Sequence, residues 1–372
     1  MKKVKLIDVC DVQYGYAFES SLFNEDKFGR QLIRIRDVLR GYSETYTNEK
    51  CSEEYVVNKG DLLVGMDGEF NIAQWKIDGA VLNQRVCKLT PHKGLHKRYL
   101  YYALIDILKK IEERTSFVTV KHLSAKEINK IEFRLPSIVE QKEIAGRLDK
   151  VAGLIEKRQD QLAKLDQLVK SRFIEMFGDI GINDKRWNAQ PLGELCTIVR
   201  GGSPRPIENF LGGDVPWIKI GDATKGDNIY LHSTKEYIIR DGVKKSRMVK
   251  AGSLIFANCG VSLGFARIIT FDGCIHDGWL AMEDIDARMD KVFLLQALNQ
   301  MTDHFRKIAP AGTQPNLNTA IMKAYVQIIP PMELQKGYIA FVEQVDKSKF
   351  EIQQSIDKLE TLKKSLMQQY FG

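Results

Sequence analysis

The chain has 372 residues, of which 44% are hydrophobic and 28% charged, which is the balance of a folded protein with room for two or three domains. Its formal net charge of +7 is compatible with nucleic-acid binding but does not require it. It has no run of 18 apolar residues and no apolar segment after the N-terminal lysines, and its six cysteines form no C-x-x-C pair. We therefore expect a cytoplasmic protein with neither a disulfide framework nor a zinc site.

Residues 1–138 are predicted to form a compact α+β domain, because short β-type runs surround one amphipathic helix. The helix is expected from Lys97 to about Arg114. The predicted strands are Gln31–Arg36, Asp61–Val64, Ala80–Leu82 and Ile131–Leu135.

A long helix is predicted next, opening at about Glu140 and ending at about Phe177. At 1.5 Å per residue it reaches roughly 55 Å. Its apolar 4-3 spacing recurs 194 residues later, and both runs close on Phe-Gly. Such seams predict two helices that pack lengthwise as a coiled coil. The seam residues are Ile144, Leu148, Val151, Ile155, Leu162 and Leu165 in the first run, and Val342, Val345, Ile352, Ile356, Leu359 and Leu366 in the second.

The seam needs nothing but its own packing, so it does not by itself require another protein. Its polar members, Arg158, Lys349 and Lys363, indicate either a device that fixes the register or a face shared with a partner.

The second half of the chain repeats the first in order. Ile33-Arg-Ile-Arg-Asp37 is echoed by Ile218-Lys-Ile-Gly-Asp222, and Leu135–Gln141 by Ile329–Gln335. Between these echoes the two halves differ widely. Divergent loops on a shared frame are what two domains with different targets need, and simple drift after duplication accounts for them equally well. The predicted boundaries are a domain at 1–138, a helix at 139–178, a linker at 179–190, a domain at 191–332 and a helix at 333–372.

Motifs for several reaction classes are absent from the sequence. It contains no phosphate-binding G-x-x-x-x-G-K-[ST], no G-x-G-x-x-G and no H-E-x-x-H. His276 and Asp277 adjoin one another, but no nucleophile elbow accompanies them, so binding or packing is the expected role. We assign no catalytic residue and no metal ligand.

Taken together, the chain resembles the specificity subunits of Type I restriction-modification systems. The resemblance rests on the two-fold repeat and on long helices that open with Pro-x-x-x-Glu-Gln-like residues, at Pro136–Gln141 and Pro330–Gln335, and end in Phe-Gly. Further pieces are Gly201-Gly-Ser-Pro204, Pro216–Asp222 and Ala311–Leu317. The first domain departs from this pattern, with Gly15-Tyr-Ala-Phe18 and Thr115–His122 at the corresponding places.

The resemblance implies an α+β fold with two globular α/β target-recognition domains in pseudo-two-fold repeat and two long antiparallel helices. It implies a non-catalytic protein whose domains each read one half of a bipartite, asymmetric DNA site, while the helices set the spacer. The implied partners are double-stranded DNA, two methyltransferase subunits that methylate adenine, and motor-nuclease subunits. No cofactor is expected in this chain, whereas S-adenosylmethionine and ATP are expected in the partner subunits.

Candidate DNA contacts follow from residue type and loop position. Arginine and lysine bind phosphates or guanine, side-chain amides pair with adenine, and aromatic side chains pack on bases or sugars. The candidates are Gln13, Tyr14, Tyr16, Arg34, Arg36, Arg40, Asn71, Gln84, Arg200, Ser203, Arg205, Lys219, Lys225, Asn258, His276, Gln314 and Asn316.

Two other interpretations remain open at this point. One is a stand-alone DNA-binding regulator with two reading heads, which would bind a specific sequence tightly without partners. The other is a coiled-coil adaptor that binds only proteins.

Overall fold

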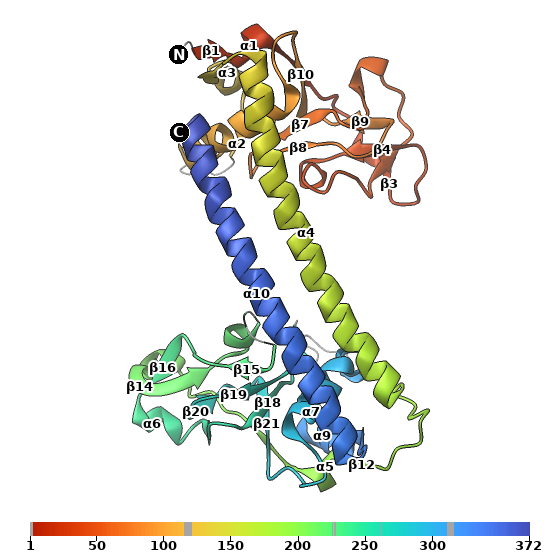
Figure 1. Ribbon diagram of the computed structural model, residues 1–372, viewed down its shortest axis with the longest axis vertical. Helices are drawn as coiled ribbons and strands as arrows, with labels where there is room; N and C mark the ends of the chain where they lie inside the picture. The colour runs from red at the N-terminus through yellow and green to blue at the C-terminus, as the bar shows by residue number, and fades with distance from the viewer. Residues whose placement is uncertain (1–2, 115–120, 225, 227, 261, 311–315) are drawn as a thin grey trace. The chain divides into compact units, whose positions relative to one another are not determined.

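The computed structural model describes residues 3–114, 121–224, 226, 228–260, 262–310 and 316–372, which divide into two compact units. Unit 1 comprises residues 1–159 and 354–372, and unit 2 comprises residues 160–353. Two helices of 40 residues each, α4 (Ile138–Phe177) and α10 (Met332–Phe371), contribute to both. Each unit therefore holds one α/β domain, the beginning of one long helix and the end of the other (Figure 1).

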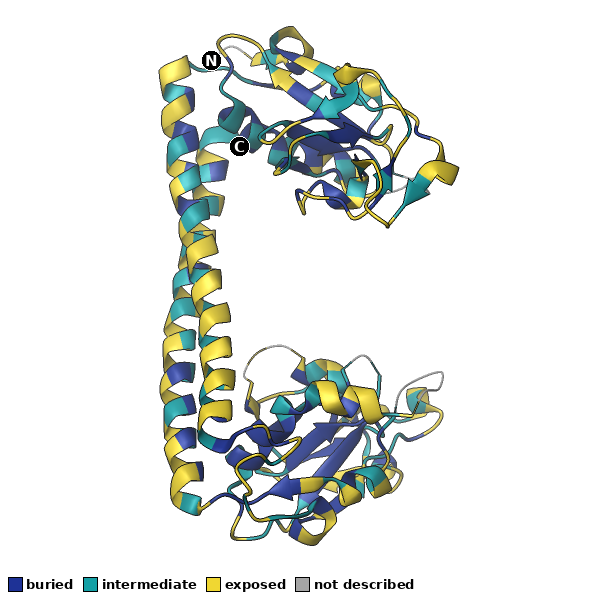
Figure 2. Cartoon of the chain, turned by 90° about the vertical axis from the view of Figure 1, so that its right-hand side faces the viewer, coloured by how far each residue is buried: buried dark blue, intermediate teal, exposed yellow. Residues whose placement is uncertain are grey.

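The domain of unit 1 is built on three small sheets whose buried strands form its centre (Figure 2). Their strand orders are β1-β11, β2-β10-β7-β8 and β3-β5-β4-β9-β6, and β4 and β9 run parallel. The strands are β1 (Lys3–Lys5), β2 (Cys10–Tyr14), β3 (Phe23–Asn24), β4 (Arg30–Ile33), β5 (Tyr46–Thr47), β6 (Val56–Val57), β7 (Leu62–Gly65), β8 (Ile72–Gln74), β9 (Ala80–Leu82), β10 (Val86–Pro91) and β11 (Glu132–Arg134). The helices before α4 are α1 (Leu6–Val9), α2 (Lys97–Arg114) and α3 (Ala125–Ile128).

The domain of unit 2 repeats this arrangement with strand orders β12-β22, β13-β21-β18-β19-β15 and β16-β14-β20-β17. The parallel pair β14 and β20 corresponds to β4 and β9, and unit 2 has a second parallel pair in β15 and β19. The strands are β12 (Ala189–Pro191), β13 (Thr197–Arg200), β14 (Leu211–Ile218), β15 (Tyr230–Leu231), β16 (Glu236–Ile238), β17 (Arg247–Val249), β18 (Leu254–Ala257), β19 (Ala266–Ile269), β20 (Gly273–Ile275), β21 (Trp279–Glu283) and β22 (Val326–Ile328). The helices before α10 are α5 (Leu192–Leu195), α6 (Arg240–Val243), α7 (Lys291–Gln300), α8 (Thr302–Ile308) and α9 (Thr319–Ala324).

The predicted helix from Lys97 to Arg114 is confirmed as α2, and the predicted end of the first long helix at Phe177 is confirmed as the end of α4. The long helix begins at Ile138, slightly earlier than predicted. The hydroxyl of Ser137 caps it by accepting the backbone N–H of Glu140 at 3.3 Å.

The predicted strand Gln31–Arg36 is wrong in its second half. Strand β4 ends at Ile33, and residues 35–37 form a short 3-10 helix. The physical cause is the carboxylate of Asp37, which accepts the backbone N–H of Arg34 at 3.0 Å and so turns the chain. Unit 2 repeats this device, because Asp222 accepts the N–H of Lys219 at 2.9 Å. In both units the aspartate of the repeated Ile-x-x-x-Asp motif therefore ends the strand by accepting a backbone N–H.

The glutamine of each helix-opening motif anchors the long helix to its domain. In unit 1 the side chain of Gln141 is fully buried. Its Oε1 accepts the backbone N–H of His96 at 2.8 Å, and its Nε2 donates to the carbonyls of Gly94 and Pro136 at 3.0 and 2.9 Å. One side chain thus satisfies three backbone groups at the junction of α2 and α4.

Gln335 makes the same three bonds in unit 2. Its Oε1 accepts the N–H of Asp290 at 2.8 Å, and its Nε2 donates to the carbonyls of Arg288 and Pro330 at 2.9 and 2.7 Å. The repeated motif is therefore explained by a repeated junction.

Replacing Gln335 by leucine is expected to destabilise unit 2 by about 3 kcal/mol, because three backbone groups lose their partner. Urea unfolding followed by tryptophan fluorescence measures this change, because three of the four tryptophans, Trp187, Trp217 and Trp279, lie in unit 2. Gln344→Leu, on an exposed position of the same helix, is the matched control and should change stability by less than about 0.5 kcal/mol. Equal stabilities of the two variants would contradict the anchoring role.

The long helices run antiparallel within each unit. In unit 1 Arg147, near the start of α4, donates to the hydroxyl of Tyr370, near the end of α10, at 3.0 Å. In unit 2 Tyr338, near the start of α10, donates to the carbonyl of Val169 at 3.3 Å. Every predicted seam residue is buried or half-buried. The seam residue Lys349 is 17% exposed and its Nζ lies 2.6 Å from Asp166 Oδ1 on α4, which favours a role in fixing the register.

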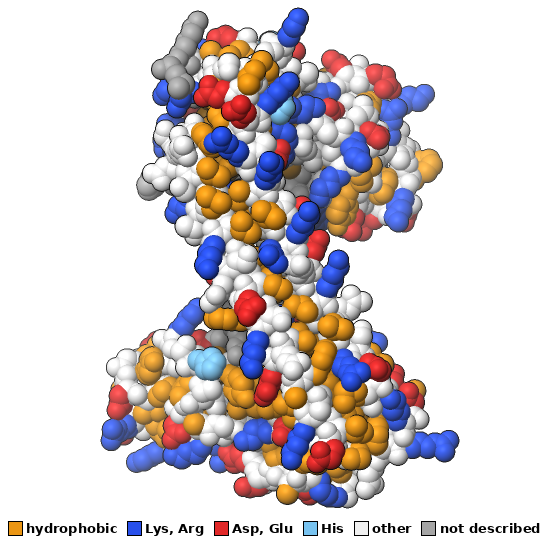
Figure 3. Space-filling view, in the orientation of Figure 1, with side chains coloured by type: hydrophobic (Ala, Val, Ile, Leu, Met, Phe, Trp, Pro, Cys, Tyr) orange, Lys and Arg blue, Asp and Glu red, His pale blue; other side chains and the backbone are white. Residues whose placement is uncertain are grey.

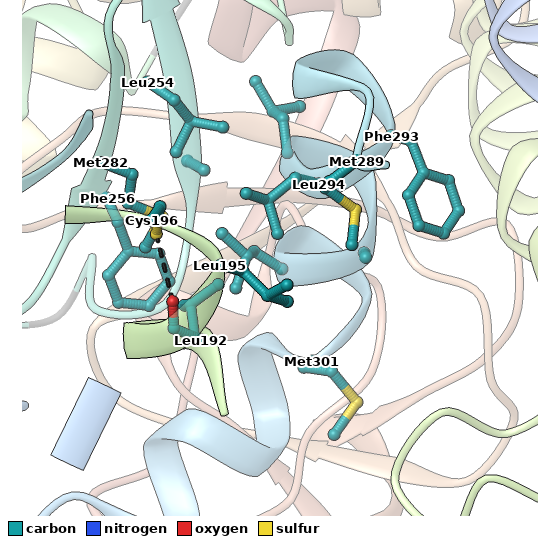
Figure 4. Close-up of a cluster of buried hydrophobic side chains, with 14 of the residues drawn as sticks. Leu192, Leu195, Cys196, Leu254, Phe256, Met282, Met289, Phe293, Leu294 and Met301 are labelled. Carbon is teal, nitrogen blue, oxygen red and sulfur yellow. Dashed lines mark hydrogen bonds between the residues drawn. The ribbon is translucent and has the colours of Figure 1, made fainter. Parts of the chain in front are cut away.

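Each helix closes on an aromatic side chain. Phe177 is fully buried against the rings of Phe293 and Tyr338, and Phe371 packs on Tyr99 with ring centroids 5.3 Å apart. Phe293 also belongs to the core cluster of unit 2, at whose edge it lies beside Met289 and Leu294 (Figure 4). The helix end is therefore continuous with the domain core.

The segment predicted as a linker at 179–190 is packed. Ile180 is 8% exposed and joins the core of unit 2, and Trp187 Nε1 donates to the carbonyl of Phe177 at 2.9 Å. No helix among the described residues has the length and apolarity needed to cross a membrane.

Candidate nucleic-acid interface

A close crossing of two loops organises the candidate site of each domain. In unit 1 Gly15 donates its N–H to Val86 O at 3.1 Å, and Tyr16 donates to Leu82 O at 2.8 Å. A Cβ on Gly15 would lie 2.0 Å from the carbonyl oxygen of Asn83. Only glycine fits this crossing, which brings the end of β2 against the turn between β9 and β10.

Unit 2 has the same crossing. Gly201 donates to Trp279 O at 2.9 Å, and Gly202 donates to Ile275 O at 3.0 Å. A Cβ on Gly201 would lie 2.1 Å from the carbonyl oxygen of His276. The two Gly-containing motifs that differ in sequence therefore hold equivalent places, and Asn83 corresponds to His276.

Asp277 lies next to four candidate residues of the second domain. Its Oδ1 accepts the hydroxyl of Ser203 at 2.8 Å and lies 3.0 Å from Nδ1 of His276. Its Oδ2 lies 3.8 Å from Nη2 of Arg205, which is 81% exposed, and its backbone carbonyl accepts Nε of Arg200 at 3.1 Å. The structure thus brings together side chains from β13, from the loop after it and from the turn between β20 and β21.

His276 is held as a neutral side chain. Burial lowers the pKa of its imidazole, and the charge of Asp277 only partly opposes this. Its Nδ1 accepts the N–H of Gly278 at 3.0 Å, a bond that requires the unprotonated nitrogen, so Asp277 Oδ1 lies beside Nδ1 without a hydrogen bond to it. Its ring lies 5.5 Å from that of Trp217. At neutral pH this position therefore offers a neutral ring rather than a cation.

Lys219 is already paired. Its Nζ lies 2.5 Å from Glu236 Oε1 and 5.1 Å from the centre of the Trp217 ring. Its ammonium group has two further N–H donors, and the side chain is 41% exposed, so Lys219 can bind a phosphate while it remains paired with Glu236.

Asn258 holds the site together from inside. It is fully buried, and its Nδ2 donates to Asn316 Oδ1 at 3.3 Å and to Leu317 O at 3.2 Å. Its enclosed amide does not lie on the surface, so this geometry supports a positioning role rather than the base contact expected for it. Asn316 is half-buried and reaches the surface beside it. Two further candidates lie outside the described residues: Lys225 and Gln314.

The first domain has a hollow of about 490 Å³ at the equivalent place. Arg34, Arg36 and Gln84 line it, all exposed, and Arg85 joins them from the turn between β9 and β10. Phe18 and Phe23 give it apolar walls. Three arginines and an amide around an apolar hollow suit the edges and backbone of DNA.

Tyr16 and Arg40 are also accessible. Tyr16 is 37% exposed, and its ring lies 4.9 Å from that of Phe18 and 5.4 Å from that of Tyr55. Arg40 is exposed, with Nη1 4.0 Å from Asp37 Oδ1.

Three other candidates of the first domain are more enclosed. Gln13 is half-buried, and its Nε2 donates to Glu54 O at 2.5 Å. Tyr14 is half-buried against the core. Asn71 is half-buried, and its Oδ1 is enclosed.

The candidate DNA contacts chosen from the sequence did not include Asp277, Arg85, Asp67 or His122, although Asp277 was noted beside His276. Nδ1 of His122 lies 2.5 Å from Asp67 Oδ1, and Nε of Arg85 lies 3.3 Å from Asp67 Oδ2. Both carboxylates join residues that are distant in the sequence, so no local spacing reveals them. The only available signal was that each follows a strand, in a loop that also carries a candidate basic or polar side chain.

The charge on the surface is mixed. On each domain the face in Figure 3 intersperses Lys and Arg with Asp and Glu rather than gathering one sign. Arginines held by carboxylates therefore characterise the candidate sites better than a broad basic patch does.

Comparison with known proteins identifies relatives for both halves. The family model described as the Type I restriction modification DNA specificity domain matches residues 1–167 and again residues 184–363. The specificity subunit of the Type I restriction enzyme EcoBI from Escherichia coli is 41% identical over 169 residues, which is 45% of this chain and 36% of that protein. The match thus spans about a third of that relative's length. The MjaIX specificity subunit of Methanocaldococcus jannaschii is 24% identical over 313 residues, 77% of this chain and 70% of that protein.

Two solved structures share the fold. The S subunit of a Type I restriction-modification system from M. genitalium has a TM-score of 0.57 at 16% identity, with 100% of this chain and 96% of that chain covered. A chain from a study of complex assembly and conformational transition in the type I R-M system has a TM-score of 0.63 at 17% identity, with 100% and 97% covered. At these identities the likeness concerns the fold alone.

Proposed function

We propose, from the premise that the chain belongs to the Type I restriction-modification DNA specificity family, that it is the subunit that selects the DNA sequence for a methyltransferase complex. Each α/β domain reads one half of a bipartite, asymmetric site. The chain performs no chemistry itself. Adenine methylation belongs to the methyltransferase subunits, with S-adenosylmethionine as their cofactor and ATP serving a motor-nuclease subunit.

One observation carries this proposal. The same loop crossing occurs in both domains, at Gly15 and at Gly201, but the side chains around it differ. In the first domain they are arginines and an amide around a hollow, and in the second they are Ser203, Arg205 and His276 around a carboxylate. A conserved frame that presents different side chains is what two independent readers of different half-sites require.

The long helices support the role of a spacer and a docking surface. Their seams are buried within each unit, while apolar side chains on other faces stay exposed: Leu154 and Leu168 are each 47% exposed, and Phe350 is 64% exposed. We propose that the helices set the distance between the half-sites and bind the methyltransferase subunits.

Methylation mapping of DNA tests the proposal. The chain is co-expressed with its methyltransferase partner, and methylated adenines are located by single-molecule sequencing. A gapped, two-part motif is expected with this chain and not with the methyltransferase alone. A stable complex without any new motif would overturn the DNA-reading role and favour the protein adaptor. Tight sequence-specific binding by the isolated chain, with no methylation in the complex, would favour the stand-alone regulator.

Exchanging the second domain for that of another family member is expected to change one half of the motif and leave the other half intact. Strand β12 (Ala189–Pro191) pairs with β22, and Asn188 accepts the N–H of Ile329 at 2.6 Å. The exchange is therefore best made at residues 188–331, so that both strands come from one parent. Changes in both halves would contradict independent reading.

A further inference from the structure

We infer that Arg85 determines specificity in the first domain by reading a guanine, and that Asp67 positions it for this contact. The inference rests on the proposed function. It adds the identity of one base that is read, guanine, and the roles of Arg85 and Asp67 in reading it. It concerns the half-site read by the domain of unit 1.

Arg85 is fixed at its backbone while its side chain stays accessible. It lies in the turn between β9 and β10, and its carbonyl accepts the N–H of Met66, directly after β7, at 3.0 Å. Its side chain is 52% exposed. The backbone of Arg85 is thus fixed next to the end of β7, and its side chain lines the hollow.

Asp67 orients the guanidinium. Its Oδ2 lies 3.3 Å from Nε of Arg85, and its own side chain is only 19% exposed. The contact is an ion pair without the geometry of a hydrogen bond, so it holds the guanidinium beside Asp67 and leaves its nitrogens as donors for another group. Within the described part of the chain, the guanidinium of Arg85 donates no hydrogen bond.

His122 keeps the carboxylate in place. Its Nδ1 lies 2.5 Å from the other oxygen, Oδ1, and the backbones of Asp67 and His122 pair as an isolated antiparallel bridge. With one oxygen on His122 and the other on Arg85, rotation of the carboxylate costs two contacts. The carboxylate that attracts Arg85 is therefore held in place before DNA binds.

An exposed arginine whose guanidinium donates no hydrogen bond within the described part of the chain fits guanine. The O6 and N7 atoms of guanine are two acceptors in one plane, and a guanidinium with free terminal nitrogens bonds both at once. The neighbouring exposed Arg34 and Arg36 can supply the phosphate contacts. The apolar walls at Phe18 and Phe23 reduce the hydration of the hollow, so polar groups that fail to pair there are penalised.

The cluster is particular to the first domain. The backbone bond from Met66 to Arg85 has its counterpart in the bond from Asn258 to Gly278, and the bridge of Asp67 with His122 corresponds to that of Cys259 with Asn316. A glycine therefore replaces the arginine, and a thiol and an amide replace the carboxylate and the imidazole. The guanine contact is expected in one half-site only.

The test is the base preference of Arg85→Ala in the intact complex with the methyltransferase. The half-site of the first domain is identified as the one that survives exchange of the second domain. In this half the wild-type complex should require guanine at one position, with a discrimination on the order of ten- to a hundred-fold. In the variant that position should accept all four bases, while the other positions and the second half-site are unchanged.

Arg30→Ala is the matched control, because Arg30 is 48% exposed and also pairs with a single carboxylate, that of Glu53. It should retain the full motif. If Arg85→Ala no longer methylates, binding of the purified complex to duplexes with each of the four bases at that position replaces the mapping. Equal loss for all four bases identifies a phosphate contact and overturns the inference. A half-site without any G·C pair also overturns it, whereas absence of any gapped motif in the wild type overturns the proposed function instead.

The role of Asp67 is tested by a double-mutant cycle. Asp67→Asn should reduce discrimination at the same position by less than Arg85→Ala does, and should have no effect in the Arg85→Ala background. An effect of Asp67→Asn that persists without Arg85, or that spreads over both half-sites, would show a structural role and contradict positioning.

Discussion

Replacing Phe177 by alanine is expected to destabilise unit 2 by about 4 kcal/mol, the cost of removing a buried aromatic side chain from a packed core. Phe177 is fully buried, with ring centroids 4.8 Å from Phe293, 5.0 Å from Phe173 and 5.5 Å from Tyr338. These partners come from α7, α4 and α10. The substitution therefore leaves a cavity where both long helices pack against the domain.

Thermal unfolding measures this effect as a fall of roughly 10 °C in Tm for unit 2. Trp187 is a suitable local probe, because its Nε1 donates to the carbonyl of Phe177 at 2.9 Å. Phe350→Ala is the control, since that phenylalanine is 64% exposed and should be nearly neutral. A change below about 1 kcal/mol for Phe177→Ala would show that the helix end does not support the domain.

The long helices were predictable because their signal is local and repeated. An apolar residue every three or four positions over 40 residues defines a helix and its buried face, and the seam residues are indeed buried or half-buried. The start of α4 was misplaced by two residues because capping by Ser137 depends on one side chain rather than on the periodicity. The duplicated order of elements was likewise predictable from the echoes alone.

The segment Ile33–Asp37 shows where the reading of local patterns failed. Alternating apolar residues suggested a strand through Arg36, but the Asp37 carboxylate captured the N–H of Arg34 and ended it. The Asp37 side chain competes with the backbone hydrogen bonds of the strand over only three residues. An aspartate three residues after Arg34 was therefore a usable signal in the sequence.

The candidate sites were predictable only in part, because contacts between distant residues decide which polar side chains are presented. Asn258 was selected for its amide, yet its backbone bonds with Gly278 and Leu317 place it in the interior. The pair of Asp67 and His122 spans 55 residues of sequence. Neither burial nor such a pair follows from spacing without the tertiary structure.

Asp277→Asn is expected to have the largest effect on sequence selection by the second domain. The carboxylate holds Ser203 and faces Arg205, and loss of its charge removes a charge-assisted contact of the kind that contributes about 1.5–3 kcal/mol. Removing a negative charge beside DNA also favours non-specific binding. Discrimination between the correct and an altered half-site should therefore fall about tenfold or more, while affinity for unrelated DNA rises.

Competition binding with the methyltransferase complex measures both quantities at one fixed salt concentration, because non-specific affinity depends steeply on salt. Asp272→Asn supplies the matched control. It removes the same charge from the same domain, but at the opposite end of β20, where Asp272 pairs with Lys250 at 2.8 Å. If both variants lose equal discrimination, net charge is the cause. If only Asp277→Asn does, and only for the half-site of the second domain, the carboxylate acts at the site itself and not through the net charge of the domain.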